Sequence, residues 1–143
     1  MLCYLLDMRI SAEYINFGNI TKTRSSGNLL IKEEFNDSNV RILYEERDAQ
    51  NDRFIRQNRW NDKGEQIQNW WFEYFENKKV EHFEEKGNQS YVRTMMDKVV
   101  NGLKVHTEEY ISKTHPQNNY IHEVTKDAKD KLISFVCNGK RVL

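Results

Sequence analysis

Turn-forming residues recur along this chain at short, nearly regular intervals, and this rhythm limits the folds open to it. The segments between the turns are rich in Val, Ile, Tyr, Phe, Trp and Thr. Such spacing is typical of an antiparallel meander. The turn clusters are Asn36 to Asn39, Asn51-Asp52, Asn61 to Gly64, Asn77-Lys78, Gly87-Asn88, Asn101-Gly102, Pro116 to Asn118, Asp127 to Asp130 and Asn138-Gly139.

Alternation within these segments assigns residues to the two faces of each expected strand. Val40, Ile42 and Tyr44 are expected on one face, opposite Arg41, Glu45 and Arg47. Two further sets are each expected to share a face: Phe54, Arg56, Asn58 and Trp60, and Leu103, Val105, Thr107, Glu109 and Ile111. Both faces therefore mix apolar and polar side chains.

An open sheet of this length would leave two edges with unpaired backbone groups, and closure removes them. We therefore expect an all-β, antiparallel, lipocalin-like (calycin-type) barrel of roughly eight to ten strands around a ligand pocket.

The amino-terminal stretch shows a different pattern. Its apolar residues approximate helical spacing, which predicts a short helix ending at Gly18, at one mouth of the barrel. The residues with this spacing are Leu2, Leu5, Leu6, Arg9, Ile10, Tyr14 and Phe17.

Length and charge limit the organisation and the partners. With 143 residues, one domain over 1–143 is expected. Lys plus Arg and Asp plus Glu number 22 each, so the net charge provides no field for nucleic acid or an anionic membrane. No long apolar run or secretion signal is visible, which favours the cytoplasm or a plastid stroma. We expect Cys3 and Cys137 to be free thiols, and the alternative is one disulfide between them.

Polar residues on apolar faces are the candidates for a site, because a buried charge needs a partner or a ligand. The alternative for each residue is that its face of the strand is exterior and the side chain is solvated. The histidines are isolated, so no metal site is expected, and adjacent glutamates point to opposite faces and cannot form an acid/base pair. The candidates are Arg56 with Asn58, Glu73 beside Trp71 and Phe75, Arg93 beside Met95, Glu109 between Thr107 and Ile111, and His122.

Two groups of residues, one near each end of the chain, carry a resemblance to a known protein family. The first match comprises Gly18, Arg24, Ser25 and the turn Phe35-Asn36-Asp37, with Ile20 where the family has tryptophan. The second runs through Glu108-Glu109-Tyr110-Ile111, Pro116, Lys126, Ser134-Phe135-Val136-Cys137 and Arg141, with Tyr110 replacing an arginine of the family. Through these residues the two ends of the chain resemble the S-type phycobiliprotein lyases, which are lipocalin-like proteins. The segment from Asp48 to Asn101 does not align.

The resemblance implies a lyase that binds an open-chain tetrapyrrole such as phycoerythrobilin and transfers it to a cysteine of a phycobiliprotein subunit. The bilin would be substrate, with no cofactor or metal. Arg24 would grip a propionate and Glu109 would face the pyrrole nitrogens. The remaining ligand-binding residues would be Arg141, Arg93, Trp71, Trp60 and Glu73.

Two other functions fit the same sequence. One is a barrel that carries a lipid or other hydrophobic acid without chemistry. The other is a protein-interaction domain of the immunity-protein type, whose mixed-charge sheet would be a docking face. The sequence also leaves open whether two copies pair through an exterior face.

Overall fold

The computed structural model describes residues 2–4, 10–16 and 18–143. The chain divides into two compact units, Met1–Trp71 and Phe72–Leu143, and each is described by itself. The single domain over 1–143 that the length leads us to expect stays a prediction.

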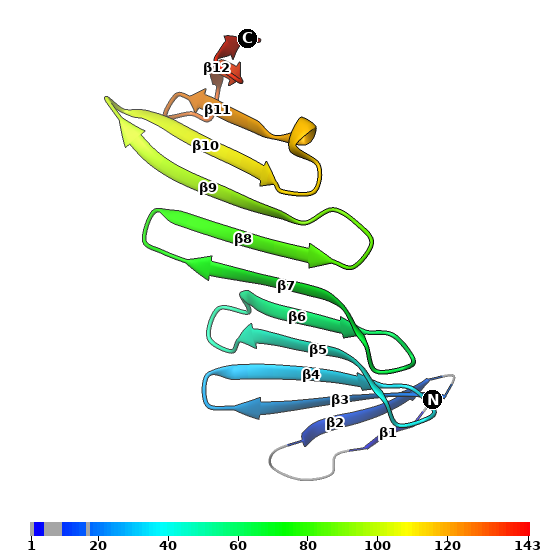
Figure 1. Cartoon of the computed structure of the whole chain (residues 1–143). Coiled ribbons are helices and arrows are strands. Elements are labelled where there is room, and N and C mark those ends of the chain that lie inside the picture. The colour runs from blue at the N-terminus through cyan, green and yellow to red at the C-terminus, as the bar shows by residue number, and fades with distance from the viewer. Residues whose placement is uncertain (1, 5–9, 17) are drawn as a thin grey trace. The chain divides into compact units, whose positions relative to one another are not determined.

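The first unit is an antiparallel sheet of successive hairpins (Figure 1). Its strands are β1 (Leu2–Tyr4), β2 (Ile10–Asn16), β3 (Asn19–Ser26), β4 (Leu29–Phe35), β5 (Arg41–Asp48), β6 (Phe54–Trp60) and most of β7 (Gln66–Tyr74).

The second unit continues the same pattern and contains one short 3₁₀ helix, η1. After the end of β7, its elements are β8 (Lys78–Glu85), β9 (Tyr91–Val100), β10 (Leu103–Ser112), η1 (Pro116–Asn118), β11 (Tyr120–Lys126), β12 (Leu132–Cys137) and β13 (Lys140–Arg141).

Turn chemistry explains why the hairpins close where they do. Asn101-Gly102 and Asn138-Gly139 each form a two-residue loop, and all four residues have positive φ, at 51°, 78°, 50° and 77°. Two successive positive φ angles define the type I′ turn, whose twist matches that of the flanking strands and which Asn-Gly adopts at low cost. The predicted antiparallel meander is therefore confirmed.

The predicted all-β, antiparallel character is confirmed, but the sheet formed by the described residues is not closed into a barrel. In each unit the strands lie in sequence order, and no pairing in the described ranges joins a first strand to a last one. Contacts between the described elements likewise join only neighbours along the chain. The unpaired edges from which closure was inferred are instead left in place, and the short β13 forms one of them.

The predicted amino-terminal helix is also wrong. β1 and β2 occupy this stretch and pair antiparallel, with Cys3 opposite Tyr14, and β2 pairs in turn with β3. Residues 5–9 and 17 lie outside the described residues. Backbone hydrogen bonds to a neighbouring strand outweigh an approximate helical spacing, because local propensity is a weak preference.

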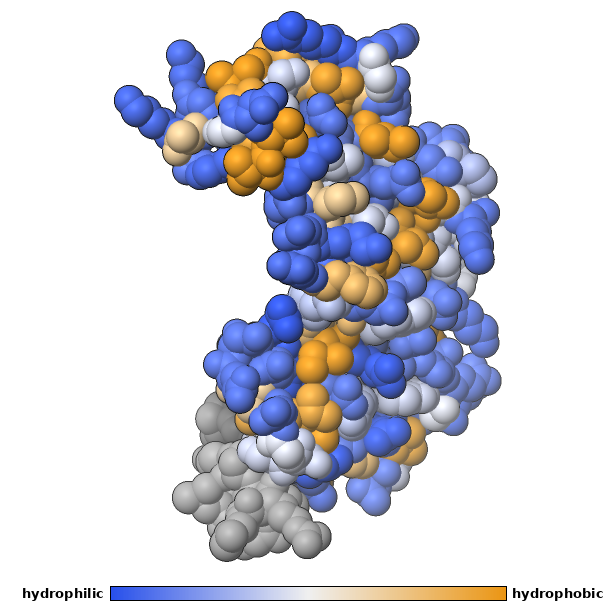
Figure 2. Space-filling view, turned by 90° about the vertical axis from the view of Figure 1, so that its left-hand side faces the viewer, coloured by the Kyte–Doolittle hydropathy of each residue, from blue (hydrophilic) through white to orange (hydrophobic). Residues whose placement is uncertain are grey.

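Neither unit has a conventional core. Among the described residues only Ile31, Leu43 and Val105 are buried hydrophobic side chains. Ile31 pairs with Glu46, three positions from Leu43 on β5, so these two residues lie on opposite faces of one sheet. The face seen in Figure 2 shows hydrophobic residues in separate patches among hydrophilic ones. Within each unit, no described element packs as a second layer against the sheet.

Register shifts change two of the predicted face assignments. Glu34 pairs with Leu43 but Phe35 pairs with Arg41, so Ile42 is an extra residue. Arg41 therefore joins the face of Tyr44, over whose ring its guanidinium lies at 5.3 Å. A similar shift at Ile55 turns Phe54 away from Arg56. Such extra residues invert the alternation, whereas Leu103 to Ile111 pair without a shift, so their predicted shared face is confirmed.

Candidate functional site

The seven predicted site residues are divided between the two units. Arg24, Trp60 and Trp71 belong to the first unit, and Glu73, Arg93, Glu109 and Arg141 belong to the second. Each set is followed within its own sheet.

Arg24 is engaged with a neighbouring carboxylate. Its Nε lies 3.5 Å from Oε1 of Glu33, and Nη1 of Arg41 lies 3.1 Å from Oε2 of the same residue. The Arg41 guanidinium also covers the ring of Trp60, at 4.8 Å from its centroid. Arg24 and Trp60 are thus linked through Glu33 and Arg41. The arrangement is a partly exposed ion-pair network of modest strength.

Trp71 and Trp70 lie on opposite faces of β7, as the alternation predicts, because Trp71 pairs with Arg56 and Trp70 with Gln57. Trp70 packs on Phe54 with ring centroids 4.6 Å apart. The Trp70 ring therefore contributes to local packing within the hairpins.

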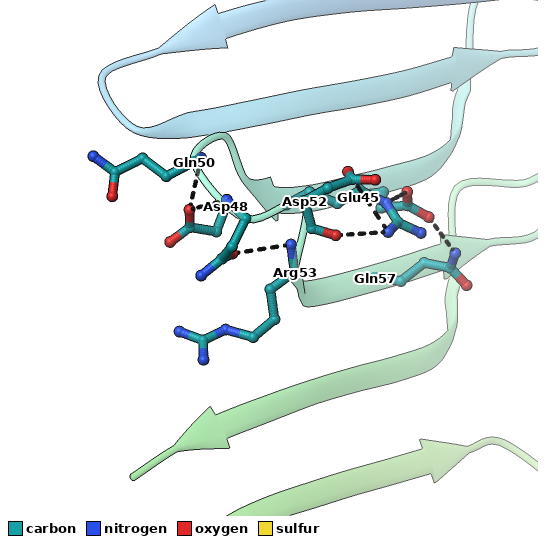
Figure 3. Close-up of polar contacts among 8 residues, drawn as sticks. Glu45, Asp48, Gln50, Asp52, Arg53 and Gln57 are labelled. Atoms are coloured by element: carbon teal, nitrogen blue, oxygen red, sulfur yellow. Dashed lines mark hydrogen bonds and ion pairs between the residues drawn. The ribbon is translucent and has the colours of Figure 1, made fainter. Parts of the chain in front are cut away.

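The β5–β6 hairpin uses its polar groups internally (Figure 3). Glu45 accepts hydrogen bonds from Nε of Arg47 at 3.0 Å and from Nε2 of the buried Gln57 at 2.8 Å. In the turn, Oδ1 of Asp48 accepts from the backbone N–H of Gln50 at 2.9 Å. These hydrogen bonds satisfy the polar groups of the hairpin and fix the conformation of its loop, which is a structural role.

A row of neighbouring aromatic rings, in stacked, tilted and edge-on pairs, crosses the second unit from β8 to β12. We call it the ring face, defined by Phe83, Tyr91, Tyr110, Tyr120, His122 and Phe135. Successive ring centroids lie 5.2, 4.8, 5.1, 4.1 and 5.3 Å apart. Each stacked pair adds about 0.5–1.5 kcal/mol beyond burial, so the row holds five strands together without a second layer.

A charged network lies on the same face. Glu81, only 2% exposed, accepts from Oη of Tyr91 at 2.6 Å and from Nε of Arg93 at 2.9 Å. Nη1 of Arg93 also lies 3.5 Å from Glu108, which accepts from Oη of Tyr120 at 2.9 Å. Arg93, predicted to bind a ligand, is therefore held between two carboxylates. No described buried side-chain polar atom lacks a hydrogen bond.

The phenols of this network stay protonated. Burial, followed by the hydrogen bond to Glu81, raises the pKa of Tyr91 far above its usual value. Burial and the bond to Glu108 likewise raise the pKa of Tyr120. Each phenol donates to a carboxylate, and deprotonation would place two negative charges side by side. These groups consequently serve as fixed donors rather than as general bases.

Glu109 lies on the other face. It pairs in register with Thr94 and with Ile121, whereas Arg93 pairs with Tyr110. Glu109 makes no hydrogen bond or ion pair with any residue that the structure describes, and the same holds for Glu123, two positions beyond Ile121. We call this the aliphatic face, defined by Met96, Thr107, Glu109, Ile111, Ile121 and Glu123.

Glu73 and Arg141 each have a contact of their own. Glu73 is exposed and hydrogen-bonds to Nε2 of His82 at 2.7 Å. Arg141 is exposed at the carboxyl-terminal edge, where its Nε donates to the carbonyl of Leu143 at 3.2 Å. Cys137 is a free, half-buried thiol that pairs in register with His122.

An open groove of about 890 Å³ lies at the far end of β9 and β10. Beyond Met96 and before Lys104 these strands extend past their neighbours (Figure 1). Three valines line the groove, Val99, Val105 and Val124, together with Lys126. Lys104, also in the groove, bonds to Asp130 at 2.7 Å, while Lys126 makes no ion pair with the described residues.

Comparisons with known proteins identify no relative. No family model, no curated protein and no solved structure matches the chain. Within the described ranges no cluster of three or more His, Cys, Asp or Glu residues could hold a metal ion, and no helix is long and apolar enough to cross a membrane. The bilin-lyase function stays a prediction.

Sequence reasoning missed the ring face and the buried Glu81. The signal was present in the loop lengths. A two-residue loop at Asn101-Gly102 sets Val100 opposite Leu103, and the pairing of Arg93 with Tyr110 follows by counting outward.

Proposed function

We propose that this protein is a non-enzymatic binding module that recognises another protein through a face of its open sheet. Of the functions that fit the sequence, the interaction domain is the one that needs no enclosed pocket. The described residues leave the sheet unclosed, so a bilin-transfer site would lack the walls that exclude water and hold the chromophore.

One observation carries the proposal. On the aliphatic face, Ile111 and Ile121 keep 46% and 51% of their surfaces exposed, beside a carboxylate without a partner. Exposed aliphatic side chains gathered on one face are a mark of interaction sites in proteins. On the ring face, by contrast, the charged groups of Glu81, Arg93 and Glu108 are paired with one another or with tyrosine hydroxyl groups. The two faces of the second unit thus differ in what they offer a partner.

The test is site-directed cross-linking in cells that encode the protein. A photoreactive benzoylphenylalanine replaces Ile121 in one variant and Val99, exposed on the opposite face, in the control. We expect one protein to be cross-linked from position 121 and not from 99, and the purified pair to form a complex that Ile121→Ser weakens at least tenfold. Equal labelling from both positions, self-cross-linking, or a complex insensitive to Ile121→Ser would contradict the proposal.

The groove supports a second candidate, the carriage of a hydrophobic acid. Its volume of about 890 Å³ suits a small ligand, its valines suit an alkyl chain, and Lys126 suits a carboxylate. Calorimetry with dodecanoate and dodecanol tests this. If this candidate function is right, dodecanoate binds more tightly than dodecanol. Lys126→Gln removes this difference in affinity, whereas the control Lys113→Gln keeps it. Equal binding of both ligands to the wild type would exclude the candidate function.

A further inference from the structure

The aliphatic face carries a second feature, an uncompensated pair of acidic side chains. Glu109 pairs in register with Ile121, so Glu123 is its diagonal neighbour on β11. Diagonal neighbours on one face lie about 7–8 Å apart. The register partners of the two glutamates are Thr94, Ile121, Thr107 and Val136, none of them a cation.

The positive charges of this face lie at its margins. Lys78 pairs with Met96 at the start of β8, where its ammonium lies 4.7 Å from the centroid of the Phe75 ring. Lys98 pairs with Val105 near the β9–β10 turn, and Arg141 pairs with Val136 at the carboxyl-terminal edge. Neither forms an ion pair within the described part of the chain. The centre of the face therefore combines negative charge with exposed aliphatic surface.

The apolar surface surrounds the acidic pair. Ile111 and Ile121 lie to one side of it, and Met96, 40% exposed, lies to the other, opposite Thr107. Glu109, Ile111 and Ile121 also line a shallow hollow of about 260 Å³. A partner side chain with an apolar stem and a cationic tip can contact both kinds of group at once.

Fixed walls surround this hollow. The side chain of Asn138 accepts from the backbone N–H of Ile121 at 2.9 Å, and that of Asn119 accepts from the N–H of Ser112 at 2.7 Å. Ser112 is itself buried, and its hydroxyl donates to the carbonyl of Ser90 at 2.9 Å. A preorganised surface loses less entropy on binding than a mobile one.

We infer that the aliphatic face binds a basic segment of a partner protein, with Lys or Arg side chains against Glu109 and Glu123 and apolar side chains against Met96, Ile111 and Ile121. This inference rests on the proposed function and adds the chemistry of the partner. Arg suits the acidic pair best, because its guanidinium can donate to two carboxylates.

The test uses two synthetic peptides that differ only in charge, one repeating Ile-Arg-Thr and the other Ile-Glu-Thr. Affinity is measured by calorimetry, and the bound surface is mapped by backbone amide shifts in NMR spectra. The variants are the isosteric double substitution Glu109→Gln with Glu123→Gln and the control Glu76→Gln. Glu76 is an exposed carboxylate in the β7–β8 turn.

We expect the arginine peptide to bind the wild type and Glu76→Gln equally, to bind the double variant at least tenfold more weakly, and to shift amides of β9 to β11. We expect no binding of the glutamate peptide. Equal binding to the double variant, shifts confined to other strands, or failure of the arginine peptide to bind the wild type would overturn the inference. If the glutamate peptide binds and Ile121→Ser removes that binding, the docking face survives but its basic partner does not.

Discussion

Arg93 and Glu109 lie on opposite faces of the β9–β10 pair, because Arg93 is in register with Tyr110 and Glu109 with Thr94. Arg93 is bound to Glu81 and Glu108 on the ring face, while Glu109 is unpaired on the aliphatic face within the described residues. The two side chains therefore cannot line one pocket in this sheet. The ring face stabilises the unit, and the aliphatic face is left for recognition.

Among single substitutions that remove a charge, loss of the buried Glu81 carboxylate should destabilise the second unit most. Glu81→Ala leaves Arg93 with one carboxylate and Tyr91 without its acceptor, so we expect a loss of about 2 kcal/mol in the free energy of unfolding. Urea unfolding followed by circular dichroism measures it. Glu84→Ala, at an exposed position of the same strand, is the control and should change stability by less than about 0.5 kcal/mol. Equal effects would show that the network contributes little.

The ring row should depend on its middle member. The Tyr110 ring contacts Tyr91 in a tilted arrangement and stacks on Tyr120, so Tyr110→Ala interrupts the row, and we expect a cost of about 2 kcal/mol. Tyr110→Phe keeps both ring contacts and should cost less than about 1 kcal/mol. Thermal or urea unfolding of the two variants distinguishes stacking from the hydroxyl group. A larger loss in the Phe variant would contradict the stacking explanation.

Alkali should weaken the first unit through Tyr44. Burial and the hydrogen bond to Glu46 raise the pKa of Tyr44 from 10.0 to about 12. A raised folded-state pKa means that the contribution to stability is complete below pH 10 and is lost as the pH rises toward 12. The difference in phenolate absorbance between wild type and Tyr44→Phe should show this late titration, and Glu46→Gln should shift it downward. A Tyr44 that titrates near 10 would refute the buried hydrogen bond.

Bilin binding should be absent or weak. The described strands do not close around a site, so mixing the protein with phycoerythrobilin should neither shift nor sharpen the visible spectrum, and no thioether should form on a phycobiliprotein subunit. A sharpened spectrum together with transfer that Arg24→Ala or Glu109→Gln reduces would instead support the lyase function implied by the sequence resemblance.

Local features of the fold were predictable from sequence, and non-local ones were not. Asn101-Gly102 and Asn138-Gly139 determine turns through the φ angles that they accept, so the meander could be predicted. Closure depends on pairing between distant strands, which no local pattern reports. The extra residues Ile42 and Ile55 invert the faces of their strands, and nothing in the alternation marks them.

Part of the site was predictable for the same reason. Glu109 was singled out because it interrupts an apolar alternation, and it does lie among exposed aliphatic side chains. Arg93, also predicted to bind the ligand, lies on the opposite face from Glu109, because side chains on different strands share a face only when the loop between them sets the register. Glu81 and Tyr91 are joined across such a pairing, which explains why neither was identified.

The central claim is that the aliphatic face is uncovered in the free protein and covered by a basic partner. The most direct test labels the isoleucine δ1 methyl groups and measures their relaxation by a soluble paramagnetic agent, with and without the Ile-Arg-Thr peptide. The account predicts strong relaxation of Ile111 and Ile121 in the free protein and protection of both by the peptide, with buried Ile31 unchanged. Protection of Ile111 and Ile121 in the free monomer, or no added protection by the bound peptide, would contradict it.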